Sequence, residues 1–115
     1  MKKAEAIQIA RDNGIHLSSQ NTTFASINLA KNVWWINIPK NRLHNERYIL
    51  LDNKSELIVC YIPGGSLNEK DFRIKGGKQI DIELSSSKYS FLIDVKSGGS
   101  KINFSGFVVA KLAIK

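Results

Sequence analysis

The sequence has few of the residues that build disulfide frameworks, metal clusters or membrane spans. One cysteine among 115 residues excludes an internal disulfide and a structural zinc site made of several cysteines. No apolar run approaches the roughly 18 residues of a membrane-spanning helix, so we expect no membrane partner. The chain is also too short for a two-domain enzyme or a (β/α)8 barrel. We therefore expect a single domain over residues 1–115.

The charge is unbalanced but not concentrated in one segment. Lysine and arginine outnumber aspartate and glutamate by 17 to 10, which gives a net charge of +7. A basic surface suits polyanions, because its cations replace the counterions around phosphates. However, 13 of the 17 cations are lysines, beside 15 isoleucines and 10 asparagines, and they are spread along the chain. An AT-rich coding sequence produces the same enrichment in lysine, isoleucine and asparagine. The positive charge can therefore reflect either a function or the base composition of the gene.

The N-terminal segment has the composition of a helix. Residues 3–13 are good helix formers, and Asn13-Gly14 supplies the left-handed residue expected just after a helix end. Polar side chains such as Glu5 and Arg11 interrupt what would be the apolar region of a secretory signal. We therefore expect a helix of the folded protein and a cytoplasmic location.

The rest of the chain is dominated by strand and turn patterns. Apolar, β-branched and aromatic residues recur in short runs separated by turn formers. The segment 107–114 fits a strand or a helix, and alternation of Val108, Ala110, Leu112 and Ile114 favours the strand. We expect an α+β fold, with the N-terminal helix packed on a mainly antiparallel sheet of six or seven strands. The other runs cover residues 24–29, 33–38, 47–51, 57–62, 72–75, 79–84, 89–95 and 102–104.

Trp34 and Trp35 are adjacent in one of these runs and must point to opposite faces of the strand. Both indoles are buried only if both faces are covered, and the sequence leaves open which one is. The apolar strands within 47–62 also need cover on two sides, which favours a homodimer, the commonest symmetric assembly. An exposed tryptophan would be an aromatic contact for a partner. A small-molecule pocket lined by Trp34, Trp35 and Tyr61 is a further hypothesis.

Two Gly-Gly turns are bordered by basic residues. Arg73, Lys75 and Lys78 surround Gly76-Gly77, and Lys96 and Lys101 surround Gly98-Gly99. Paired glycines suit tight hairpin turns, and exposed turns tolerate lysine whatever their function. Our leading hypothesis is a non-catalytic binding protein whose basic hairpin edges contact nucleic acid or an acidic protein surface.

The segment Asp94-Val95-Lys96 supports an alternative. An acid and a lysine two apart on a strand share a face, and with further carboxylates such a pair can hold Mg²⁺ for phosphodiester cleavage. The segment resembles the (D/E)-x-K motif of the restriction-endonuclease-like family. The resemblance implies a metal-dependent nuclease, with Asp81 or Asp52 as the strand acid and Glu5 as the helical acid. The same pattern also fits an ordinary surface ion pair.

The remaining reactive residues carry no recognisable chemistry. His16 and His44 have no partner at metal-ligand spacing. Cys60 lies in an apolar run, where a thiol usually behaves as a small buried hydrophobe. We therefore favour a protein that is not an enzyme and needs no cofactor, with Mg²⁺ expected only under the nuclease alternative.

Overall fold

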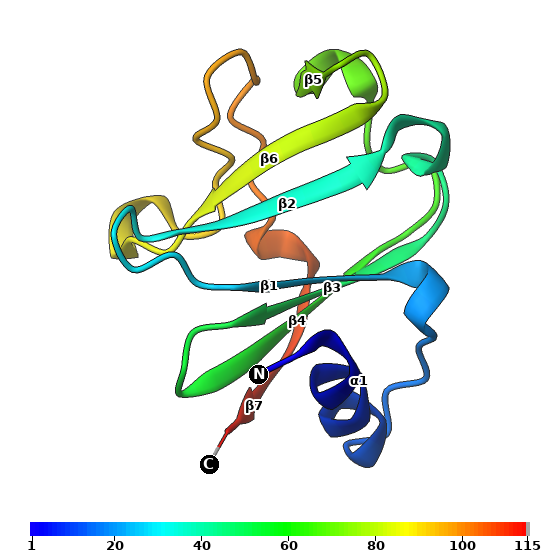
Figure 1. The fold of residues 1–115 in the computed structure, drawn as a ribbon, viewed down its shortest axis with the longest axis vertical. Helices are drawn as coiled ribbons and strands as arrows, with labels where there is room; N and C mark the ends of the chain where they lie inside the picture. The colour runs from blue at the N-terminus through cyan, green and yellow to red at the C-terminus, as the bar shows by residue number, and fades with distance from the viewer. Residues whose placement is uncertain (115) are drawn as a thin grey trace.

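The computed structural model describes residues 1–114 and contains one α-helix and seven strands (Figure 1). The α+β class and the N-terminal helix packed on mainly antiparallel strands are confirmed, and 107–114 contains a strand as expected. Within residues 1–114 no helix has the length and apolar character needed to cross a membrane. The elements are α1 (Lys3–Asp12), β1 (Thr22–Ser26), β2 (Val33–Pro39), β3 (Arg47–Asp52), β4 (Glu56–Ile62), β5 (Arg73–Lys75), β6 (Gln79–Ser85) and β7 (Val108–Ala113).

The seven strands form two sheets, a division that the strand patterns did not predict. The four-stranded sheet has the order β1-β3-β4-β7, with β1 and β3 parallel and the other pairs antiparallel. The three-stranded sheet has the order β2-β6-β5 and is antiparallel throughout. In Figure 1 the three-stranded sheet lies on one side of the four-stranded sheet and α1 on the other. The fold therefore has three layers.

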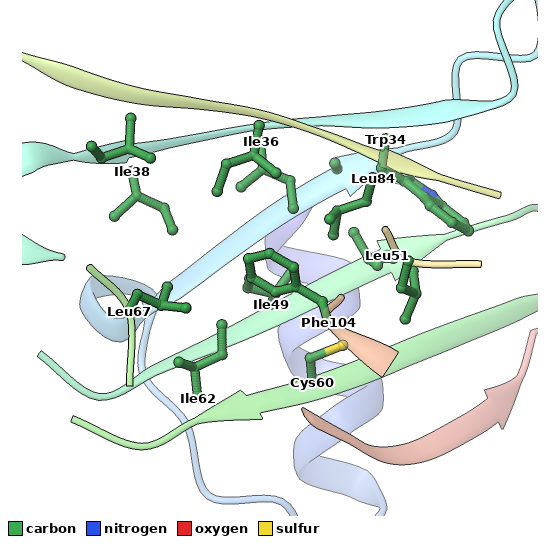
Figure 2. Packing of buried hydrophobic residues seen from close by; sticks show 14 of the residues in the cluster. Trp34, Ile36, Ile38, Ile49, Leu51, Cys60, Ile62, Leu67, Leu84 and Phe104 are labelled. Carbon is green, nitrogen blue, oxygen red and sulfur yellow. The ribbon is translucent and has the colours of Figure 1, made fainter. Parts of the chain in front are cut away.

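Each interlayer space holds its own hydrophobic cluster. Figure 2 shows the larger one, in which side chains of β2 and β6 meet those of β3 and β4. The smaller cluster lies between α1 and the opposite face of the four-stranded sheet and contains Ala6, Ile7, Ala10, Leu17, Leu50, Leu57 and Val59. β3 and β4 are thus buried on both faces, because their alternate side chains enter different clusters.

This layering corrects the reasoning behind the homodimer. The second face of the strands within 47–62 is covered by the three-stranded sheet of the same chain. Burial of β3 and β4 therefore requires no second copy, and the homodimer stays a prediction without its original basis.

The expected strand at 89–95 is wrong. Lys88–Ser90 is a single 3₁₀ turn, and the segment after it joins its neighbours only through isolated bridges, Leu84 to Asp94 and Ile93 to Asn103. Tyr89, the first residue of this run, is 94 % exposed. The hydroxyls of Ser85 and Ser90 lie 2.7 Å apart and hold the chain in this turn. Local side-chain hydrogen bonds of this kind compete with strand pairing.

Candidate functional site

The outer face of the three-stranded sheet carries several of the residues singled out from the sequence. Alternate residues of β2 and β6, such as Ile36 and Ile82, are buried against the four-stranded sheet, so the residues between them point outward. The pairing aligns these residues in rows across the strands, with Trp35 opposite Glu83. We call this surface the outer face; its residues are Trp35, Asn37, Arg73, Lys75, Gln79, Asp81 and Glu83.

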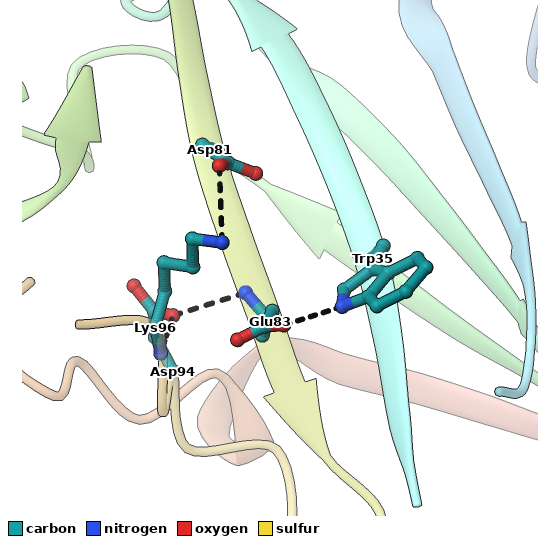
Figure 3. Close-up of polar contacts among 5 residues, drawn as sticks. All are labelled: Trp35, Asp81, Glu83, Asp94 and Lys96. Atoms are coloured by element: carbon teal, nitrogen blue, oxygen red, sulfur yellow. Dashed lines mark hydrogen bonds and ion pairs between the residues drawn. The ribbon is translucent and has the colours of Figure 1, made fainter. Parts of the chain in front are cut away.

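The two tryptophans have opposite environments. Trp34 is 1 % exposed, and its indole N–H donates to the main-chain oxygen of Asp52 at 3.0 Å. Trp35 is 49 % exposed, and its indole N–H donates to the carboxylate of Glu83 (Figure 3). Trp35 is therefore the tryptophan that is exposed to a partner, with the Lys31 ammonium group 5.5 Å from its ring centroid.

The three residues of the hypothetical tryptophan-lined pocket do not lie together in the structure. Trp34 lies in the cluster between the sheets, whereas Trp35 points away from it. Tyr61 borders a different hollow of about 500 Å³, which is bounded by the end of α1 and by β7 and includes neither tryptophan.

Asp94 and Lys96 lie side by side, but they have different surroundings (Figure 3). Asp94 is fully buried, and its Oδ1 accepts hydrogen bonds from the main-chain N–H groups of Glu83 at 3.1 Å and Lys96 at 3.0 Å. Its Oδ2 has no partner. Burial raises the pKa of this carboxyl, an effect that its two hydrogen bonds oppose and that the charges of Glu83 and Asp81 reinforce. Asp94 thus anchors the following loop to β6.

Asp81, Asp94 and Lys96 of the nuclease hypothesis are brought together, whereas Glu5 is not. Lys96 forms an ion pair with Asp81 at 3.4 Å, next to Asp94. Glu5 lies on α1, across the four-stranded sheet, and its carboxylate accepts a hydrogen bond from the main-chain N–H of Lys2. Asp52 accepts one from the main-chain N–H of Lys54 within the β3–β4 turn. Among residues 1–114, no group of three His, Cys, Asp or Glu side chains is placed to hold a metal ion.

The two basic Gly-Gly turns, distant in the sequence, lie at the same end of the molecule (Figure 1). A Cβ added to Gly98 would be 3.6 Å from Cδ of Arg73, and the Ser100 N–H donates to the main-chain oxygen of Asp71 at 2.9 Å. Arg73 and Lys101 are exposed in this region. The two turns therefore present one shared basic surface.

Next to it is a hollow of about 540 Å³ that we call the Lys75 hollow. It is lined by Asn37, Lys75, Gly76, Lys78 and Gln79. Gly76 and Gly77 have φ of +61° and +70°, the left-handed values that the turn between β5 and β6 requires. The turn thereby places two exposed ammonium groups beside the outer face.

A second group of cations was not predicted from the sequence. Lys3, Arg42 and Arg47 border one hollow of about 380 Å³, together with Asn37 and Pro39 from β2. We call it the Arg47 hollow. Its cations come from α1, the turn after β2 and the start of β3, so no local motif unites them. The sole signal in the sequence is that Arg42 and Arg47 are two of only four arginines.

Cys60 has the environment of a structural residue. Its side chain is fully buried between the sheets, and burial raises the pKa of the thiol to about 12. Since the thiolate is the reactive form, we expect labelling by a thiol reagent at pH 8 to be far slower in the native protein than in denaturant. Mass spectrometry measures the labelling. Equal rates in the native and the denatured protein would contradict the buried position of Cys60.

Comparison with protein-family models, with curated protein sequences and with solved structures gives no match.

Proposed function

We propose that the protein is a non-catalytic module that binds single-stranded nucleic acid across the outer face. The observation that carries the proposal is the placement of the exposed Trp35 and the Lys75 hollow on the same face, with Asn37 between them on β2. Proteins of this functional class combine a cationic track for the phosphates with aromatic rings on which bases stack.

The charges of the outer face fit this partner. Asp81 is paired with Lys96, and Glu83 is engaged by the Trp35 indole. Arg73, Lys75 and Lys78 form no ion pair with a carboxylate of residues 1–114. The charged side chains left available for a partner are therefore the cationic ones. Lys96, grouped with them in the sequence analysis, is already held by Asp81.

The test is fluorescence anisotropy with a labelled oligothymidylate at several salt concentrations. We expect affinity to fall with salt, and a Lys75→Gln/Lys78→Gln variant to reduce the log–log slope by about 1.4, since each phosphate contact contributes about 0.7. Trp35→Ala should weaken binding by about fivefold or more without changing this slope, because stacking is not ionic.

The matched control is Lys54→Gln/Lys111→Gln, which removes the same charge from the four-stranded sheet and its β3–β4 turn. We expect it to bind like the wild type. Two results would overturn the proposal: no binding at low salt, or equal losses in the two double variants. Binding of acidic peptides without binding of oligonucleotides would instead support a protein partner.

A further inference from the structure

The Arg47 hollow concentrates positive charge with no carboxylate to balance it. Its lining combines three cations with hydroxyl and amide side chains and includes no acid: Lys3, Ser19, Gln20, Thr22, Thr23, Phe24, Asn37, Pro39, Arg42 and Arg47. None of the three cations forms an ion pair within residues 1–114. Glu46 borders an adjoining hollow with Arg42 and Arg47. Its carboxylate accepts the hydrogen bond of the Tyr61 hydroxyl at 2.6 Å.

Arg47 is the unusual residue of this group. It is only 7 % exposed, and its Nε is buried without a hydrogen-bond partner. One terminal nitrogen donates to the hydroxyl of Thr23 at 2.6 Å. A guanidinium carries five N–H donors, and burying a charge without an opposite partner is costly. The protein therefore maintains a buried cation that a single neutral hydroxyl only partly satisfies.

The other two cations increase this imbalance. Burial and then the charge of Arg42 lower the pKa of Arg47, and burial and then the charge of Arg47 lower the pKa of Lys3. Lys3 is held in place by donating to the main-chain oxygen of Ser19 at 2.9 Å. Like charges are thus kept close together, an arrangement that an anion between them would relieve.

We propose that Lys3, Arg42 and Arg47 form a binding site for a single phosphate-type oxyanion, with Thr23 as a neighbouring hydroxyl. Arginine favours such ligands because its planar fork donates two parallel hydrogen bonds to their oxygens. Three positive charges suit a dianion better than a monovalent carboxylate. The site does not depend on the proposed function, since it uses neither Trp35 nor the β5–β6 turn. It does border Asn37, which also lines the Lys75 hollow.

The test is isothermal titration calorimetry with inorganic phosphate, and with acetate at matched ionic strength. We expect one phosphate per chain, with acetate bound at least about tenfold more weakly. Arg42→Gln should weaken phosphate binding about tenfold or more, as expected for loss of a hydrogen bond to a charged group. Lys54→Gln, in the remote β3–β4 turn, is the matched control and should leave the affinity unchanged.

Arg47→Met adds a second readout, because it keeps an apolar stem while removing the charge. We expect it to abolish phosphate binding and to melt no lower than the wild type in phosphate-free buffer, because the uncompensated charge is gone. Absence of phosphate binding by the wild type, or equal affinity in wild type and Arg42→Gln, would overturn the proposal. Either result leaves oligonucleotide binding by Trp35 and Lys75 to be judged separately.

A nucleoside monophosphate, titrated in parallel, identifies the source of the phosphate group. Tighter binding than inorganic phosphate, with the same dependence on Arg42, assigns the site to a phosphomonoester. Equal or weaker binding assigns it to the free ion. Both outcomes support the site.

Discussion

Replacement of Trp34 by alanine is expected to lower the free energy of unfolding by about 3–5 kcal/mol, the usual cost of truncating a buried aromatic side chain. Trp34 fills the space between the two sheets and meets the ring of Phe91 edge-on, with centroids 6.4 Å apart. The main-chain oxygen of Asp52 would keep a second hydrogen bond, from the N–H of Ile27 at 2.9 Å. The loss is therefore mainly one of packing, and it is large against a total stability of about 5–15 kcal/mol.

Trp35→Ala is the matched comparison, since it removes the same side chain from the adjacent position. We expect it to cost no more than about 1 kcal/mol, because the indole is half exposed and its bond to Glu83 lies at the surface. Urea unfolding of both variants, monitored by far-UV circular dichroism, measures the difference. A larger loss for Trp35→Ala would mean that β2 is placed one residue out of register, because such a slip exchanges its two faces.

The sequence predicts the local parts of this fold well. Alternation in 33–38 placed the two tryptophans on opposite faces, and Asn13-Gly14 marked the end of α1, where Gly14 has φ of +81°. The Gly76-Gly77 turn was correctly placed between two paired strands. These features depend on side-chain spacing and backbone conformations that neighbouring residues decide, so they can be read without knowledge of distant contacts.

The division into two sheets could not be predicted in the same way. Trp35 pairs with Glu83, 48 residues away, whereas β1 pairs in parallel with β3. Each of these strands has an apolar face that would satisfy several partners, and only packing of the whole chain selects among them. We expected a second copy of the chain to cover the second face of β3 and β4, because the sequence did not reveal that the chain forms a second sheet. That second sheet covers this face.

The candidate sites could likewise be predicted only in part, because charge pairing depends on tertiary contacts. Lys96 was grouped with the basic turns, but the fold pairs it with Asp81. Arg47 was not singled out, because neither its burial nor its hydrogen bond to Thr23 exists until β1 and β3 lie side by side. Charge can be counted from a sequence. Which charges stay unpaired is decided by tertiary contacts.

Asp94→Ala is expected to lower the free energy of unfolding at pH 7 by about 2–4 kcal/mol, because two main-chain N–H groups lose a charged acceptor. The variant also frees the loop that Asp94 holds against β6. Asp94→Asn is the control, since its side-chain oxygen can still accept both bonds. It should be much less destabilising than alanine. Equal losses in the two variants would mean that these hydrogen bonds are not what anchors the loop.

The pH dependence of Asp94→Asn separates the charge of this residue from its hydrogen bonds. Burial raises the pKa of Asp94 in the folded protein, so the folded chain holds this proton more tightly than the unfolded chain, whose aspartates titrate near 3.9. The contribution of Asp94 to stability is then greatest below about pH 4 and falls as the pH rises through the folded pKa. Asparagine does not titrate. Relative to wild type, Asp94→Asn should therefore become more stable between about pH 4 and pH 7. Urea unfolding of both proteins across this range measures the difference, and an opposite slope would show that the two hydrogen bonds outweigh burial and lower the pKa.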